Sequence, residues 1–181
     1  MDALTLLKER RSIRKFKKEK VSREVIREVI ETARFAPSWA NFQIARYTVV
    51  EDEELKNKIC SEGYNGVIGN MAIANSASGV VILSYVNGKS GHAPATGEKA
   101  SVKGDTWSMF DAGIAALQFC LAAYEKGVGT VIQGLFNEEI IGKLIGLPDD
   151  EIVAAVIPYG YEETHPNATP RKSVDEIARF K

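Results

Sequence analysis

The sequence predicts a fold of the α/β or α+β class, because strand-like apolar runs alternate with helical segments along the chain. Two segments carry this prediction. Residues 79–86 form a nearly continuous apolar run, which is typical of a central buried strand, and residues 105–126 form a long helix with little polar surface. The chain has 181 residues, of which 45% are hydrophobic, so we expect a single domain over residues 1–181.

The N-terminal half is expected to contain three helices and two strands. Asp2 caps a first helix that extends to about Lys8, and Ser22 caps a second helix that ends before Pro37. A β-branched strand at residues 46–50, a helix at 53–61 and the buried strand at 79–86 follow.

The C-terminal half begins with a surface excursion. Residues 87–104 contain four glycines and few large apolar residues, a length that is uncommon unless the segment is disordered or functional. The long helix begins at Asp105 and is ended by Gly127 and Gly129. The remaining elements are a short strand at 130–132, a helix capped by Asn137, a strand at 152–159 and a terminal helix with capping-box spacing between Ser173 and Glu176.

The composition argues against several classes of partner. The formal net charge is -1, so no global field attracts nucleic acid or an acidic membrane. Cys60 and Cys120 lie in apolar sequence without a CxxC motif, which favours reduced core thiols, and His92 and His165 belong to no cluster of metal ligands. No apolar run approaches the roughly 18 residues of a membrane span, and no signal peptide is evident. We expect a cytoplasmic protein without a metal.

Two basic clusters lie near the ends of the chain. The first is Arg10-Arg11-Ser12-Ile13-Arg14 and the second is Thr169-Pro170-Arg171-Lys172. In an extended segment Arg10, Ser12 and Arg14 share one face and can present two guanidinium groups and a hydroxyl group to a phosphate. The alternative is a solvated charged face, because eight Lys and Arg residues occur from Lys8 to Lys20.

Four motifs give the chain a resemblance to a known family. They are ERRSIRKF at residues 9–16, APSWANFQ at 36–43, GVGTVIQG at 127–134 and PRK at 170–172. In order and spacing they resemble the nitroreductase family of FMN-dependent oxidoreductases over nearly the whole chain. The resemblance implies an α+β fold, a three-layer sandwich with a central mixed β-sheet flanked by helices, and assembly as a homodimer.

The resemblance also implies which residues bind the phosphate and ribityl end of FMN. They are Arg10, Arg11, Ser12 and Arg14, with Arg171 and Lys172 closing over the phosphate from the C-terminal side. The alternative for Arg11 and Arg14 is a surface ion pair.

The flavin ring would be reached by the loop at 36–43, in part from the partner subunit. The residues carried over from this loop are Pro37, Ser38, Trp39, Asn41 and Gln43, although the loop also fits a plain polar turn and Trp39 also fits a core position. Asn70 would contact the ring, and Ile73 stands where the family has a lysine. The backbone amides of Gln133 and Gly134 would lie beside the redox-active ring nitrogen. The alternative is that residues 127–134 only end a helix and form a turn.

These features predict electron transfer from NADH or NADPH through FMN to a small-molecule acceptor, such as a nitroaromatic or a quinone, by a ping-pong mechanism. Ile44-Ala45-Arg46 replaces the Pro-Trp pair that commonly follows the family's glutamine, which leaves the acceptor open. Reductive dehalogenation and flavin fragmentation are alternatives within the family. From a different class, a non-catalytic protein could bind an anion or nucleic acid through the basic run. We expect an enzyme with neither nucleic acid nor a membrane as partner.

Overall fold

The computed structural model describes residues 1–181 and confirms the α+β class. Its sheet has four strands in the order β1-β2-β4-β3. They are β1 (Ala45–Val50), β2 (Gly79–Val86), β3 (Gly129–Thr130) and β4 (Glu151–Gly160), and each neighbouring pair is antiparallel. The parallel component of the expected mixed sheet is a single bridge between Ser12 and Thr130, at edge strand β3.

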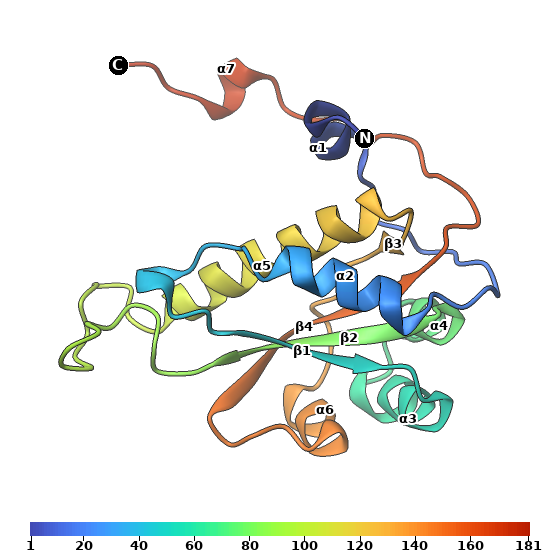
Figure 1. Cartoon of the computed structure of the whole chain (residues 1–181), viewed down its shortest axis with the longest axis horizontal. Coiled ribbons are helices and arrows are strands. Elements are labelled where there is room, and N and C mark those ends of the chain that lie inside the picture. The colour runs from blue at the N-terminus through green and yellow to red at the C-terminus, as the bar shows by residue number, and fades with distance from the viewer.

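Helices cover both faces of the sheet (Figure 1). They are α1 (Ala3–Glu9), α2 (Arg23–Ala33), α3 (Glu53–Gly63), α4 (Ile68–Ser76), α5 (Thr106–Glu125), α6 (Glu138–Ile145) and α7 (Val174–Ile177), with a short 3-10 turn, η1, at Trp39–Asn41. Helices α2 and α5 pack on one face, while α3, α4 and α6 pack on the other. The expected three-layer arrangement is therefore confirmed.

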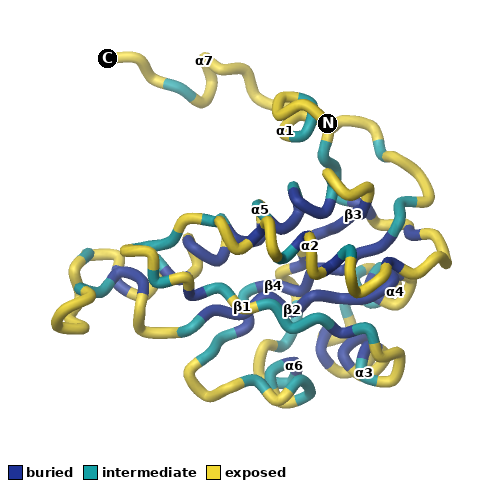
Figure 2. Tube along the Cα trace, in the orientation of Figure 1, coloured by how far each residue is buried: buried dark blue, intermediate teal, exposed yellow.

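Strand β2 is buried on both faces, as its apolar sequence predicts. Val81 and Leu83 pack against α2 and α5, whereas Val80 and Ile82 pack toward α3, α4 and α6. Successive side chains of a strand alternate between the faces, so a strand in the middle layer needs a continuous apolar run. The buried centre of the sheet is dark blue in Figure 2.

Capping side chains set where most of the expected helices begin. The Asp2 carboxylate accepts hydrogen bonds from the backbone of Leu4 and Thr5. Ser22, Asp52 and Asn137 each accept one from the residue three positions later. All six helices that the sequence predicts are present, and strand β3 is one residue earlier and shorter than expected.

Helix α4 was not predicted. Its N-cap, Val67, has no side-chain oxygen to accept a hydrogen bond, and Ala74 is its one buried residue. The segment carries a glycine and two asparagines, which have weak helix propensity. Tertiary packing against the sheet therefore stabilises this helix more than its own sequence does.

Helix α5 keeps one apolar side uncovered. Met109, Phe110 and Leu117 are 51%, 58% and 49% exposed, while nine other residues of the helix are buried. The apolar surface that the sequence gives this helix is therefore not all covered within the single chain. Neither α5 nor any other helix has the length and apolar character needed to span a membrane.

Residues 87–104 fold back on themselves. Ala93 N–H donates to Glu98 O (2.8 Å) and Ala100 N–H donates to Gly91 O (2.9 Å). Gly91 has a φ of 87°, and a Cβ atom there would lie 2.1 Å from the Gly104 carbonyl oxygen. The segment is thus a closed loop whose ends touch, and only glycine fits at position 91.

Beyond β4 the chain leaves the body of the molecule (Figures 1 and 2). It first pairs with the N-terminal segment, through hydrogen bonds from Lys17 N to Tyr161 O (2.8 Å) and from Glu163 N to Lys15 O (3.1 Å). The rest, including α7, extends away from the sheet. Its apolar side chains Val174, Ile177 and Phe180 are exposed.

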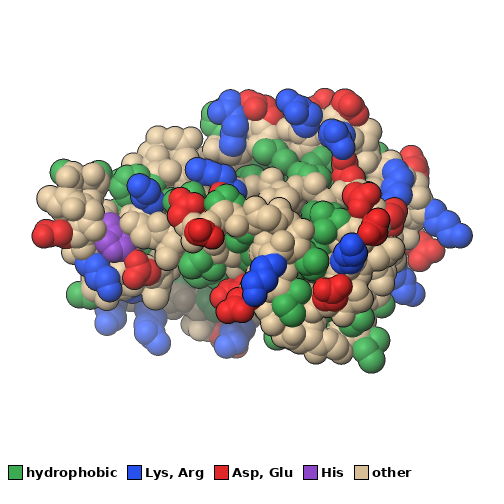
Figure 3. Space-filling view, turned by 90° about the horizontal axis from the view of Figure 1, so that it is seen from below, with side chains coloured by type: hydrophobic (Ala, Val, Ile, Leu, Met, Phe, Trp, Pro, Cys, Tyr) green, Lys and Arg blue, Asp and Glu red, His purple; other side chains and the backbone are tan.

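The surface formed by α3 and α6 carries charges of both signs. Figure 3 shows the face of α3 and α6, where basic and acidic side chains are interspersed with hydrophobic ones. This mixture agrees with the formal net charge of -1. No extended single-sign patch is visible on that face.

Candidate functional site

The N-terminal basic segment is held against β3. Ile13 N–H donates to Thr130 O (2.9 Å), and Ser12 forms the parallel bridge to Thr130. The buried Ile13 side chain occupies the space over Gly129, where a Cβ atom would lie 2.6 Å from Ile13 Cγ1. Because side chains alternate in an extended segment, Ser12 and Arg14 lie on the side opposite Ile13.

A cavity of about 300 Å³ lies beside Ser12 and Arg14, lined by Ser12, Arg14, Lys15, Thr164 and Pro166. The lining thus offers two cationic side chains and two hydroxyl groups, and it contains no carboxylate. Hydrogen bonds from charged donors are the usual means of binding a phosphate group. The donor set therefore fits the phosphate of FMN.

The other residues assigned to the phosphate have different surroundings. Arg10 is half-buried and precedes Ser12 by two residues in the chain. Arg11 Nη1 donates to Lys8 O (2.7 Å) and Arg10 O (3.0 Å), so it braces the end of α1. Arg171 donates to the carbonyl oxygens of Thr169 and Pro170 (3.1 Å each), and no hydrogen bond or ion pair joins Arg171 or Lys172 to the N-terminal segment. Within the single chain, no hydrogen bond or ion pair therefore joins the two basic clusters.

Asn70 and Gln133 come together from α4 and the connection after β3. Gln133 Nε2 donates to Asn70 O (3.3 Å), and the Tyr64 hydroxyl donates to Gln133 Oε1 (2.5 Å). The carboxamide of Asn70 makes no hydrogen bond within the chain, so it remains available to a ligand. Ile73 packs beside Ile13 and Phe16 and offers no polar group.

One of the two backbone amides expected beside the ring is already paired. Gln133 N–H donates to Val156 O (2.8 Å), and Val156 N–H donates back to Gln133 O (3.1 Å). Gly134 is exposed and its N–H has no partner in the chain. Nothing lies within 4 Å of the place where its Cβ would be. Gly134 is therefore the donor that a ring could approach.

The loop at residues 36–43 lies at the other end of α5 (Figure 1). Trp39 N–H donates to Asp111 Oδ2 (2.9 Å), in the second turn of α5, whereas Thr130 follows the end of that helix. The helix has 20 residues and is therefore about 30 Å long. A single chain does not bring Pro37, Ser38, Asn41 and Gln43 to the N-terminal cavity.

Asp111 joins this loop to residues 87–104. Its Oδ2 atom also accepts a hydrogen bond from Ser90 Oγ (2.6 Å). The Trp39 indole N–H donates to His92 O (2.9 Å), and its ring packs on Trp107 with the centroids 5.1 Å apart. Trp39 therefore belongs to this aromatic cluster rather than to the surroundings of Gly134.

The backbone of the same loop is strained. Ala40, Asn41 and Gln43 have φ angles of 46°, 55° and 50°, although none is glycine. Each such residue costs about 1 kcal/mol or more, and clusters of them are typical of ligand-binding sites. Ser38 Oγ accepts a hydrogen bond from Gln43 N–H (2.8 Å), which stabilises this conformation.

Three buried residues of these networks, Tyr64, Ser90 and Asp111, were not among the sequence candidates. Asp111 carried a signal, because it is the one acidic residue between Asp105 and Glu125 in a strongly apolar helix. Tyr64 carried none, since its partner Gln133 is 69 residues away.

Comparisons with known proteins agree with the motifs. A family model described as the nitroreductase family matches residues 7–161. The chain is 28% identical over 187 aligned positions to a candidate NADH dehydrogenase/NAD(P)H nitroreductase of Archaeoglobus fulgidus, covering 99% of this chain and 98% of that protein. It is 29% identical to an iodotyrosine deiodinase of Thermotoga neapolitana, covering 97% and 95%.

The solved structures show the same fold. A candidate nitroreductase of Exiguobacterium sibiricum, solved in complex with FMN, superposes with a TM-score of 0.84 at 22% identity. The superposition covers 100% of this chain and 98% of that one.

Proposed function

We propose, because this chain belongs to the nitroreductase family, that it binds FMN and transfers electrons from NADH or NADPH to a small-molecule acceptor such as a nitroaromatic or a quinone. When bound, FMN supplies the redox chemistry, since it takes a hydride from the nicotinamide and passes electrons to the acceptor. The observation that carries the proposal is the bridge between Ser12 and Thr130, because it sets the basic segment beside residues 130–134.

The side chains would bind and orient the cofactor. Ser12, Arg14 and Lys15 would hold the phosphate through charge-assisted hydrogen bonds of about 1.5 to 3 kcal/mol each. The Asn70 carboxamide and the Gly134 N–H would face the ring. Ile132 and Leu135, which flank Gly134, are 48% and 65% exposed, and an apolar ring would cover them. Arg10 is proposed as a further phosphate ligand, and Arg171 and Lys172 stay predictions.

A second copy of the chain would complete the site. The loop at 36–43 is too far along α5 to reach the cavity of its own chain, but a two-fold related copy can present it. The uncovered side of α5 and the apolar C-terminal residues provide surface for such a partner. Obligate dimer interfaces bury roughly 2,000 Å² or more. We therefore infer a homodimer in which each site combines the N-terminal segment of one copy with the loop of the other.

The thiols fit a reducing compartment, and we place the enzyme in the cytoplasm. Cys60 and Cys120 are free and buried. Burial raises the pKa of the Cys60 thiol to about 11, which suppresses the reactive thiolate.

The visible spectrum of the purified protein tests the cofactor. We expect flavin absorption, release of FMN on denaturation, and one FMN bound per chain when the apoprotein is titrated. A colourless protein that takes up no FMN would contradict the proposal. If that protein bound nucleic acid with an affinity that falls steeply with salt, the basic run would instead be a nucleic-acid site.

Steady-state kinetics test the order of events. The sequence carries no nucleotide-binding motif separate from the flavin site, so nicotinamide and acceptor should occupy that site in turn. We expect parallel double-reciprocal lines when NADH or NADPH is varied at several fixed acceptor concentrations. Intersecting lines would indicate that both substrates bind together and would rule out a ping-pong mechanism.

Reductive dehalogenation is a second candidate, favoured by the match to the iodotyrosine deiodinase. The two candidates differ in the acceptor and share the cofactor. Release of iodide from iodotyrosine by the reduced protein, at a rate above that of nitroaromatic or quinone reduction, would favour the second.

A further inference from the structure

We propose that Tyr64 is a positioning residue for the flavin. Its hydrogen bond to Gln133, together with the neighbouring bond from Asn137 N–H to Gly63 O, fixes the connection between β3 and α6, which carries the Gly134 N–H. In this way Tyr64 tunes the affinity and the reduction potential of FMN. This inference rests on the proposed function. Nothing in the four motifs includes Tyr64, which lies at the end of α3.

The hydrogen bonds around Gln133 have defined directions. Tyr64 is fully buried, and burial raises the pKa of its hydroxyl, so the proton stays on the oxygen. The backbone carbonyl oxygen of Asn70 can only accept a hydrogen bond. The Gln133 side chain therefore points its amino group toward Asn70 and its Oε1 atom toward Tyr64. Both ends of the buried carboxamide are therefore satisfied in one orientation only.

Gly63 and Tyr64 anchor the connection between β3 and α6 at both of its ends. Tyr64 binds the Gln133 side chain at the start, and Gly63 O accepts a hydrogen bond from Asn137 N (2.6 Å) at the start of α6. Gly63 is packed against Ile141 of α6, where a Cβ atom would lie 2.7 Å from Ile141 Cγ1. Gly134 lies between these two anchors, and its own N–H has no partner in the chain.

The same network links Gly134 to Asn70. Gln133 ties the connection to α4 through the Asn70 carbonyl, so the free Asn70 carboxamide and the free Gly134 N–H are held in one relative position. A donor beside the ring stabilises negative charge on the reduced form more than on the oxidised form. Loosening that donor should therefore weaken binding of reduced FMN most.

The chain offers a matched control. Tyr159 is also fully buried, but its hydroxyl has no hydrogen-bond partner. Tyr64→Phe and Tyr159→Phe each remove one buried oxygen atom, and only the first breaks the network. Ile59→Val, in the apolar core of α3, adds a control for loss of stability without loss of a polar contact.

The test measures FMN affinity and midpoint potential in the full-length proteins. For Tyr64→Phe we expect the dissociation constant of oxidised FMN to rise about tenfold, which is about 1.4 kcal/mol. If reduced FMN weakens about tenfold more than oxidised FMN, the midpoint potential falls by about 30 mV for the two-electron couple. Both control variants should keep the wild-type potential, whatever their thermal stability.

Each outcome decides the proposal. A Tyr64→Phe protein with the same potential as the two controls would overturn the positioning role and leave the FMN function intact. A wild-type protein that takes up no FMN would overturn both. Should Tyr64→Phe fail to fold, Gln133→Met keeps the length of the side chain, lacks both polar ends, and is expected to show the same drop in potential.

Discussion

Two variants that each lose FMN are expected to regain it when their chains are combined in one dimer. The first variant is Arg10→Ala with Arg14→Ala, which removes cations from the N-terminal segment. The second is Asn41→Ala with Gln43→Ala, which alters the loop at the other end of α5. In a dimer of one chain of each kind, one site carries all four changes and the other carries none, because each site draws its two halves from different copies.

The homodimers set the baseline. Losing one charge-assisted hydrogen bond costs about 1.5 to 3 kcal/mol, so the variant without Arg10 and Arg14, which loses two, should bind FMN weaker by about two to four powers of ten. Co-expression with two different affinity tags allows the mixed dimer to be purified. It should hold about one FMN per dimer and show about half of the wild-type activity per dimer.

A second mixed dimer distinguishes the recovery of one intact site from a general stabilisation of a damaged chain by its partner. All four changes in a single chain, paired with a wild-type chain, leave each site with one damaged half, so that dimer should bind FMN poorly at both sites. A mixed dimer without FMN would show that each chain builds its own site. A monomer at low micromolar concentration that still holds FMN would refute the dimer itself.

Local chemistry made most of the fold predictable. Asp2, Ser22 and Asn137 cap helices through contacts three residues away or nearer, and the apolar run of β2 reports burial on both faces. These signals act over a few residues, so a sequence shows them directly. Helix α4 lacked such a signal, because neither its cap nor its amphipathicity is marked.

The candidate site was only partly predictable, because some of its contacts are local in the sequence and others join distant residues. The alternation of Ser12, Ile13 and Arg14 indicated an extended basic segment, and the structure adds the anchoring of Ile13 over Gly129. The contacts of Asp111 with Trp39 and of Tyr64 with Gln133 span 72 and 69 residues. No local pattern encodes such pairs, and they become visible only when the layers are packed.

The resemblance to a family also had a limit. It named the loop at 36–43 and the N-terminal cluster as parts of one site, while the chain places them at opposite ends of α5. The resemblance implied that part of the loop comes from the partner subunit, but it did not say which residues do. The length of α5 indicates that the loop and the N-terminal cluster of one site come from different copies, because about 30 Å separates the ends of the helix.

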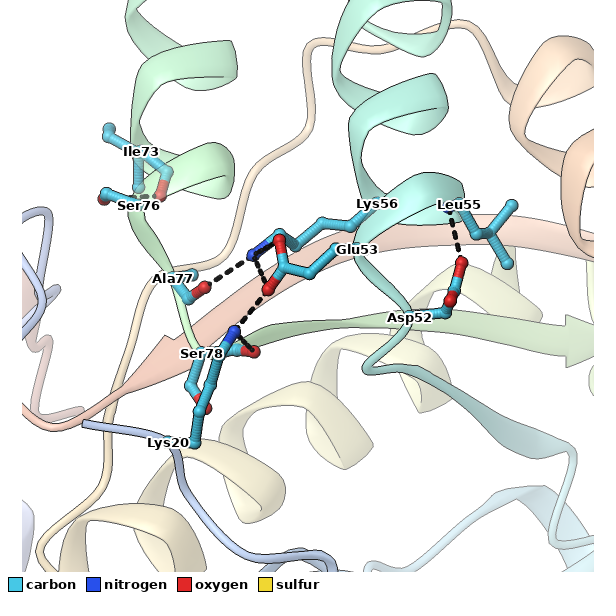
Figure 4. Close-up of polar contacts among 9 residues, drawn as sticks. All are labelled: Lys20, Asp52, Glu53, Leu55, Lys56, Ile73, Ser76, Ala77 and Ser78. Carbon is cyan, nitrogen blue, oxygen red and sulfur yellow. Dashed lines mark hydrogen bonds and ion pairs between the residues drawn. The ribbon is translucent and has the colours of Figure 1, made fainter. Parts of the chain in front are cut away.

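Replacing Lys56 by Ala is expected to cost about 3 to 5 kcal/mol of folding free energy. Lys56 is 1% exposed, and its Nζ donates to Ala77 O (2.9 Å) and pairs with Glu53 Oε2 (3.0 Å) (Figure 4). The ammonium group thus fastens α3 to the turn between α4 and β2. Truncation would leave a cavity for the aliphatic stem and an unpaired buried carbonyl at Ala77.

Lys20 is the matched control for this change, because it pairs with the same carboxylate from the surface. Its side chain is 57% exposed, and its Nζ also donates to Ser78 O (3.2 Å). Exposed ion pairs contribute about 0 to 1 kcal/mol, so Lys20→Ala should lie within that range. Chemical denaturation of the two variants measures the difference, and equal losses would show that burial of Lys56 adds nothing.

The pH dependence of stability gives a second readout for the same pair. Hydrogen bonds from Lys20, and then from Lys56, hold the pKa of Glu53 below its usual 4.5. A lowered folded-state pKa means that Glu53 stabilises the fold above pH 4.5 and that this stabilisation is lost as the pH falls through the lower value. The wild-type protein should therefore lose stability in that acidic window, and Glu53→Gln should lose less over the same window. An identical acid profile for the two proteins would show that Glu53 does not stabilise the buried Lys56 ammonium group.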